Sequence, residues 1–354
     1  MQDLVSSHQL KDALTLINHI GSTEIFKYKG SLLEARYWHR VHAIALAQRN
    51  VNLAVKSQQA VVRILGNHFA GSSPACLDEL HVLQVDLIAG EYWKELLPIV
   101  RLFRLQLTRS PIKIAAEKYQ SWLQETCATV FVAATDGKHS ADQRLVLLSI
   151  FPEVCLDKHK LMDMCSALMG ADQVRVRMAA DRNLINTANS LADNLTADEK
   201  RRVIIAHLGI MFWHLDNETY DQEAEDAARS ATEGLRAKHP IDFPILIQAQ
   251  TMYYMILARR GKLEAASTVF DALRIPDDTL KVTMDLGPYS NACTHVAAEY
   301  AKRGDEAGVR KQFTRLAELV KSQRLLVVDP HLLQAWDGTE KTLLQEAKNN
   351  QKSQ

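Results

Sequence analysis

The sequence predicts an all-α protein, folded as a right-handed solenoid of about seven or eight antiparallel helical hairpins. Two observations favour this class. The 354 residues include only 14 glycines and 9 prolines, whereas a β-sandwich or barrel needs turn residues roughly every 8–12 positions. Hydrophobic residues also recur at spacings of three and four, as in Leu80, Leu83 and Leu87. This spacing is typical of buried helix faces.

Helix boundaries are marked by local signals. Capping boxes, in which a Ser or Thr is followed three residues later by Glu or Gln, occur at residues 6–9, 140–143 and 196–199. Glycine or proline interrupts the helical pattern at 66–74, 110–111, 136–137, 151–152, 239–240, 275–278, 287–288 and 329–330. The intervals predict about fourteen to sixteen helices, and their short connections place consecutive helices antiparallel.

An internal repeat is clearest near the C-terminus. A turn glycine and a packing aromatic residue both recur after 43 residues, in the pairs Gly261–Gly304 and Phe270–Phe313. Weaker copies surround Asn50 and Gly90, which are 40 residues apart. Repeats of this length indicate helical hairpins, each packing on its neighbours.

These segments resemble the tetratricopeptide (TPR) motif, in which a glycine closes the turn, an alanine allows close packing and an aromatic residue fills the next layer. Counted from Gly261, Ala266 and Phe270 match the alanine and aromatic positions. In the second copy Tyr300 and Phe313 match, and Val309 replaces the alanine. The closing proline is misplaced or missing, and the period exceeds the family's length of about 34 residues. The resemblance implies a TPR-like array of irregular period.

We expect the TPR-like solenoid to cover residues 1–330, with any subdivision near 136–140 or 240. A terminal helix and a frayed polar tail should occupy 331–354. After Val320 only Leu325–Val328 has a strand pattern, so we expect no closing winged-helix domain. Because the apolar end of a solenoid needs a cap, we expect a hetero-complex rather than a monomer.

The charge balance and the cysteine pattern bear on the class of partner and on the cellular compartment. The 42 basic and 42 acidic residues cancel, which does not favour nucleic acid as a partner but leaves it open. No secretory leader or apolar membrane span is evident. The five cysteines form no CxxC pair and no even framework; they are Cys76, Cys127, Cys155, Cys165 and Cys293. We therefore expect a cytoplasmic or nuclear protein without a membrane segment.

No pattern in the sequence indicates a catalytic, cofactor or metal site. Cys155, His159 and Cys165 lie within eleven residues, but no fourth zinc ligand is evident. His39 and His42 have no third ligand nearby, so a surface or packed helix face explains them better. The acidic residues within 216–226 could hold Ca²⁺ or a basic partner, yet they lack the EF-hand pattern. An exposed first turn of a helix accounts for them more simply.

The leading hypothesis is a non-enzymatic protein-interaction scaffold or adaptor, a complex subunit that holds an extended peptide or a helix in a concave groove. The family's groove positions correspond here to Gln248, Thr251, Met255, Arg259, Asn291, Thr294, Ala298 and Lys302. The alternative is RNA binding, because residues 255–273 and 300–316 also resemble pentatricopeptide hairpins, which read one base per repeat.

Overall fold

The described residues of the computed structural model run from 29 to 352, except 49, 69–73, 110–115, 192–193, 237–242, 273–286 and 323–329. Before residue 29, only positions 12, 15, 16, 19 and 27 are described. The described part contains fifteen helices, α3 to α17, and no strand, which confirms the all-α class. The capping box at 6–9, the breaks at 110–111, 239–240 and 275–278, and the strand pattern at 325–328 lie outside it.

The chain divides into two compact units, Met1–Ser190 and Leu191–Gln354. This boundary lies between the two positions that the sequence breaks suggested, 136–140 and 240. Each unit has its own packed helices.

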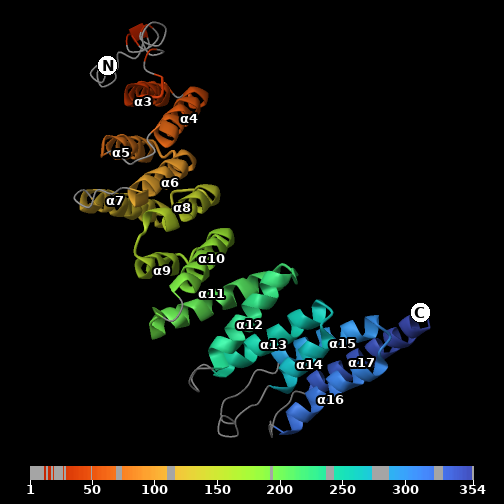
Figure 1. Cartoon of the computed structure of the whole chain (residues 1–354). Coiled ribbons are helices and arrows are strands. Elements are labelled where there is room, and N and C mark those ends of the chain that lie inside the picture. The colour runs from red at the N-terminus through yellow and green to blue at the C-terminus, as the bar shows by residue number, and fades with distance from the viewer. Residues whose placement is uncertain are drawn as a thin grey trace. The chain divides into compact units, whose positions relative to one another are not determined.

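In the first unit, consecutive helices pack as pairs, α3 with α4, α5 with α6 and α7 with α8. The first helices of these pairs contact one another in the order α3, α5, α7, and the second helices in the order α4, α6, α8 (Figure 1). The helices are α3 (Leu32–Ala47), α4 (Val51–His68), α5 (Pro74–Ala89), α6 (Trp93–Arg109), α7 (Ala116–Thr135), α8 (Ala141–Val154), α9 (Lys158–Ala167) and α10 (Val174–Leu191).

The second unit repeats this pairing in α11 with α12, α13 with α14 and α15 with α16. The last helix, α17, packs on both α15 and α16, and Ala347 is fully buried against them in one core cluster. Residues 346–351, which we expected to be frayed, are therefore helical. The helices are α11 (Ala197–Asp216), α12 (Gln222–Arg236), α13 (Phe243–Arg259), α14 (Leu263–Asp271), α15 (Gly287–Lys302), α16 (Glu306–Ser322) and α17 (Pro330–Gln351).

One backbone turn recurs at the end of five first helices. In each, an amide N–H donates to the carbonyl five residues earlier, the bond that identifies a Schellman turn. The bonds are Asn50 to Ala45 (2.8 Å), Tyr92 to Leu87 (2.9 Å), Thr219 to His214 (2.9 Å), Lys262 to Leu257 (2.8 Å) and Asp305 to Tyr300 (3.0 Å). We call these the hairpin turns.

The hairpin turns give the repeat a more regular length than the sequence suggested. Asn50 is equivalent to Tyr92, 42 residues later, and not to Gly90. Thr219, Lys262 and Asp305 follow one another at 43 residues. In the four turns where the residue before the donor is described, that residue adopts left-handed backbone angles, which glycine does without steric cost. Gly261 and Gly304 occupy this position with φ of 79° and 72°, whereas Glu91 and Glu218 adopt 58° and 52° there.

The break predicted at residues 151–152 is wrong, because α8 continues through Pro152 to Val154. Proline has no N–H to donate to the carbonyl four residues earlier, here that of Leu148. The side-chain amide of Asn183 in α10 donates to this carbonyl instead, at 2.9 Å. The capping boxes of Ser140 with Gln143 and Thr196 with Glu199 are confirmed.

His39 and His42 are both buried, and His39 joins α3 to α5. Its Nδ1 lies 2.5 Å from the Glu79 carboxylate and its Nε2 lies 3.0 Å from that of Asp86. Burial alone lowers the pKa of His39, but the hydrogen bonds to Asp86 and Glu79 outweigh it and raise the pKa. His39 is therefore an interhelical ion-pair residue, with partners about forty positions away in the sequence.

Asp181 of α10 is a buried acid whose Oδ1 has no hydrogen-bond partner within the described residues. Burial raises its pKa from 3.8 to about 7, although Arg177 and Arg182 act in the opposite direction. Because the folded state disfavours the charged form, this group's stabilising effect is greatest below pH 4 and is lost as the pH rises towards 7.

We expect Asp181→Asn to stabilise the protein by roughly 1–3 kcal/mol at pH 8, because the amide cannot ionise. The stability difference from wild type should shrink as the pH falls from 7 to 4. Urea unfolding across this pH range, followed by circular dichroism, measures it. Asp172→Asn, at an exposed position, is the control and should change little. Equal pH slopes for wild type and Asp181→Asn would contradict the assignment.

Gly304→Ala should destabilise the protein by about 1–2 kcal/mol, because a left-handed φ disfavours a Cβ atom. A Cβ there would also lie only 3.0 Å from the backbone of Gln351. The matched control is Gly338→Ala on the exposed face of α17, where a Cβ meets nothing within 4 Å. That change should instead stabilise the helix by about 0.5–1 kcal/mol. Urea midpoints that shift in the same direction for both variants would refute the role of the turn.

Candidate partner-binding face

The eight groove positions derived from the sequence lie on α13 and α15, which pack against each other. Tyr254 secures this packing from the interior, where its hydroxyl donates to the side-chain oxygen of Gln312 in α16. Burial raises the pKa of Tyr254. Ala292 and Val296 of α15 complete the apolar cluster around it. The two first helices are therefore held side by side by apolar side chains that do not belong to the eight candidates, with a polar contribution from Arg259.

The four candidates on α13 differ in their accessibility. Thr251 is 1% exposed, and its hydroxyl donates to the carbonyl of Ile247 within the same helix at 2.7 Å. It offers no surface for a partner. Gln248, Met255 and Arg259 are half-buried.

On α15, Asn291 and Lys302 are exposed, and Thr294 and Ala298 are half-buried. Ala298 packs against the core cluster that contains Phe313 and Trp336. Asn291 and Lys302 are thus the most accessible of the eight.

Arg259 and Lys302, the two cations of this set, converge on one carboxylate. Arg259 Nη1 lies 3.0 Å and Lys302 Nζ 2.8 Å from Glu299 Oε1. Arg259 also donates to His295 Nδ1 at 2.7 Å. Burial and then the Arg259 charge lower the pKa of His295. Packing of α13 on α15 therefore brings the two expected cations together, but Glu299 neutralises part of their charge.

The repeat alignment could not have found Glu299 and His295, because it considered only the family's groove positions. Both follow the helical spacing of α15, one turn apart and facing α13. A search for acids opposite Arg259 would have identified Glu299, once the pairing of the two first helices was known.

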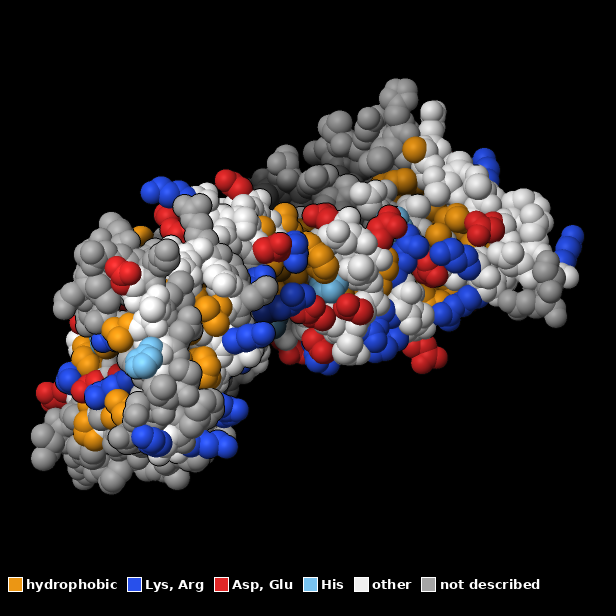
Figure 2. Space-filling model, turned by 90° about the horizontal axis from the view of Figure 1, so that it is seen from above, with side chains coloured by type: hydrophobic (Ala, Val, Ile, Leu, Met, Phe, Trp, Pro, Cys, Tyr) orange, Lys and Arg blue, Asp and Glu red, His pale blue; other side chains and the backbone are white. Residues whose placement is uncertain are grey.

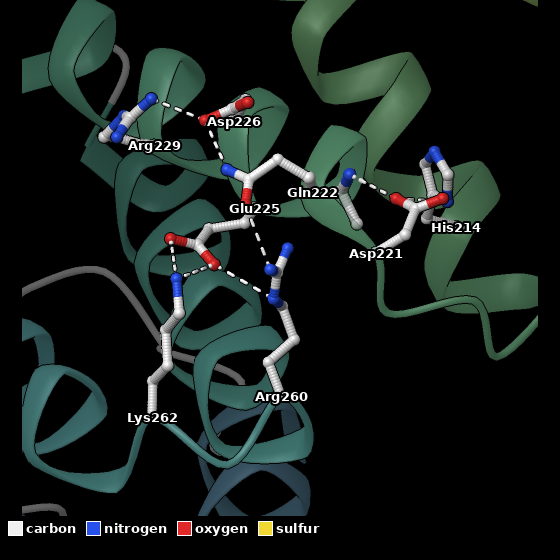
Figure 3. A network of polar contacts seen from close by, with 9 residues as sticks. His214, Asp221, Gln222, Glu225, Asp226, Arg229, Arg260 and Lys262 are labelled. Carbon is white, nitrogen blue, oxygen red and sulfur yellow. Dashed lines mark hydrogen bonds and ion pairs between the residues drawn. The ribbon is translucent and has the colours of Figure 1, made fainter.

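The acidic run at 216–226 is largely engaged in internal contacts. Glu225 is buried, and its carboxylate binds Lys262 Nζ at 2.7 Å and Arg260 Nε at 3.1 Å. These two cations flank the hairpin turn after α13. Figure 3 shows Glu225 between them, and beside it Gln222 donating to Asp226, which also pairs with Arg229.

His214 lies at the other end of this network. It is buried, and its ring nitrogens contact Thr219 Oγ1 at 2.8 Å and Glu223 Oε2 at 3.2 Å. Asp216, Glu218 and Asp221 are exposed, as we expected of this run, whereas Glu225 is buried. The contacts of Glu223 and Glu225 bind together α11, α12 and the turn after α13.

No arrangement of three or more His, Cys, Asp or Glu side chains suited to a metal ion occurs in the described part of the chain. The four cysteines whose side chains are described, Cys127, Cys155, Cys165 and Cys293, are free thiols in the interior. Across the described helices, none is long and apolar enough to cross a membrane.

Replacing Glu225 with alanine should lower the free energy of unfolding by roughly 2–4 kcal/mol, because Arg260 and Lys262 lose their buried partner. Asp226→Ala is the matched control on the adjacent position. Its pair with Arg229 is half-exposed, so the loss should stay below about 1 kcal/mol. Chemical denaturation followed by circular dichroism gives both values. Similar losses for the two variants would show that Glu225 has no special structural role.

Comparison with known proteins assigns no family to this chain. No family model matches the sequence, and neither a curated protein nor a solved structure gives a match.

Proposed function

We propose that this chain is a non-enzymatic protein-interaction scaffold with a TPR-like, right-handed solenoid architecture. As a subunit of a larger assembly in the cytosol or nucleus, it binds a partner segment along the first helices of its hairpins. The observation that carries the proposal is the recurrence of one hairpin turn at 42–43 residues. This recurrence places equivalent first helices next to each other, and such rows form extended binding surfaces in helical-repeat proteins.

The chemistry of the α13–α15 face suggests what it binds. Asn291 and Lys302 of α15 are exposed, and Gln248 and Met255 of the adjacent α13 are half-buried. An amide side chain hydrogen-bonds a peptide backbone in either direction. Lys302 pairs with Glu299 at 2.8 Å, but its side chain is 54% exposed, so its ammonium group can also bind an acidic group of a partner. We therefore propose an extended peptide with a carboxylate near Lys302 as the ligand of this face.

RNA binding by a pentatricopeptide-like array remains the alternative. Binding to phosphates depends on cations that are not already neutralised, whereas Arg259 is paired with Glu299 at 3.0 Å. Figure 2 shows acidic and basic side chains interspersed on the visible face. These observations favour a protein partner over RNA.

The double variant Asn291→Arg/Lys302→Glu should reduce the partner proteins captured from cell extract by about fivefold or more, since an interface charge pair of this kind contributes about 1 kcal/mol or more. Affinity purification with quantitative mass spectrometry measures the loss. Lys200→Glu, an exposed charge reversal on α11, is the control and should capture the wild-type set.

Two outcomes of this experiment would count against the proposal. If the double variant captures the same proteins as wild type, the α13–α15 face is not the binding surface. If ribonuclease treatment releases the captured material, the RNA alternative is correct.

A further inference from the structure

A pocket of about 460 Å³ opens in the first unit, where the C-terminal halves of α5 and α7 meet the turns that follow them. Its walls are largely apolar, and they include Ile88 and Ala89 of α5 and Ala128, Val132 and Ala133 of α7. The volume lies within the roughly 300–1,000 Å³ typical of ligand sites. This pocket is separate from the α13–α15 face, which belongs to the other unit.

Two carboxylates line the same pocket. Glu91 belongs to the turn after α5, and Asp136 follows α7. Both are exposed, and within the described residues neither forms an ion pair. Asp136 Oδ1 accepts only the backbone N–H of Lys138, at 3.0 Å. Lys94 and Lys138, the nearest cations in the sequence, do not line the pocket. The site therefore carries uncompensated negative charge.

Two aromatic side chains, Trp93 and His139, also line the pocket. Trp93, at the start of α6, is 5% exposed, and its indole N–H has no partner within the described structure. The ring of His139 packs edge-on against this indole, with ring centroids 5.8 Å apart. The indole nitrogen is itself buried, so Trp93 serves the pocket as part of its wall.

An apolar surface leads from the pocket along α5. Val82 and Val85 are 45% and 49% exposed, and with Ala89 they follow the helical spacing of one face. On α7, Val132 is 61% exposed, the highest value among the large hydrophobic side chains described. Exposed apolar residues gathered around a pocket are typical of a protein-binding surface. The ligand should therefore be longer than the pocket alone accommodates.

We propose that this pocket binds an arginine or lysine side chain of a partner polypeptide, whose neighbouring apolar residues lie on Val82, Val85 and Val132. Basic side chains suit the site because their aliphatic stems pack on apolar walls and their charged ends reach carboxylates. The guanidinium group of arginine can contact Glu91 and Asp136 together. This site is in addition to the α13–α15 face and does not depend on it.

The test uses the full chain and fluorescent ten-residue peptides of valine and alanine, with arginine, lysine, citrulline or glutamate at the centre. Fluorescence polarisation should show the tightest binding for the arginine peptide. Citrulline, which has nearly the shape of arginine but no charge, should bind about tenfold more weakly. Affinity for the arginine peptide should also fall with added salt.

Three variants locate the binding. Glu91→Gln/Asp136→Asn should weaken arginine-peptide binding by about tenfold or more, whereas Glu117→Gln, an exposed acid near the start of α7, should leave it unchanged. The variant Glu91→Gly distinguishes a loss of peptide binding from a loss of folding stability. Glycine suits the φ of 58° at this position, so the thermal midpoint should hold or rise while affinity falls.

Any one of three results would overturn the proposal. The arginine peptide shows no measurable binding, the arginine and citrulline peptides bind with equal affinity, or the double variant binds the arginine peptide as tightly as wild type does. Equally tight binding of free butylguanidine would also overturn it, because the pocket would then be a small-molecule site that makes no use of the valines on α5.

Discussion

The backbone hydrogen bond that closes each hairpin turn is the constraint on which the rest of both units depends. It ends the first helix with one left-handed residue and reverses the chain within a few positions. The second helix must then pack back on the first. Because the same bond recurs at 42 or 43 residues, equivalent helices meet equivalent helices. The α13–α15 face arises from this regularity, because both of its helices end in this bond.

Side chains from one hairpin secure the turn of the next. Lys262, just after one turn, binds the buried Glu225 of α12. Arg303, beside the next turn, donates to the carbonyl of Gly261 at 3.1 Å, and Asn350 of α17 donates to that of Ala301 at 3.1 Å. Much of the charge in the second unit therefore fixes the register between hairpins. An ion pair that sets register leaves little net charge for a ligand, so a count of charges along the sequence says little about binding.

The all-α class and many of the helix boundaries could be predicted from the sequence, because capping boxes and hydrophobic periodicity are local signals. The continuation of α8 through Pro152 could not be predicted in this way. The side-chain donor that compensates for the proline is Asn183, which lies 31 positions further along the chain. The repeat length was underestimated around Gly90 because a glycine was taken as the left-handed residue, whereas Glu91 adopts those angles. The preference of glycine for left-handed angles pointed to Gly90, whereas the hydrogen bond from Tyr92 to Leu87 identifies Glu91 as the left-handed residue.

The candidate site was predicted less well, because it also depends on contacts between residues that lie far apart in the sequence. The repeat alignment singled out Arg259 and Lys302, but it could not show that Glu299 binds both. The pocket beside Trp93 has no sequence signature at all. It is formed by residues from two separate segments, 88–93 and 128–139, and none of its residue types is unusual for a helix.

A period fixed by backbone geometry also has a consequence for how such a chain can change during evolution. Adding or removing about 43 residues inserts or deletes one complete hairpin and leaves every remaining turn in its place. An insertion of another length within a helix rotates the side chains after it by about 100° per residue and misaligns the contacts between hairpins. Changes in the length of this protein should therefore occur in whole hairpins, or be confined to the connections between them.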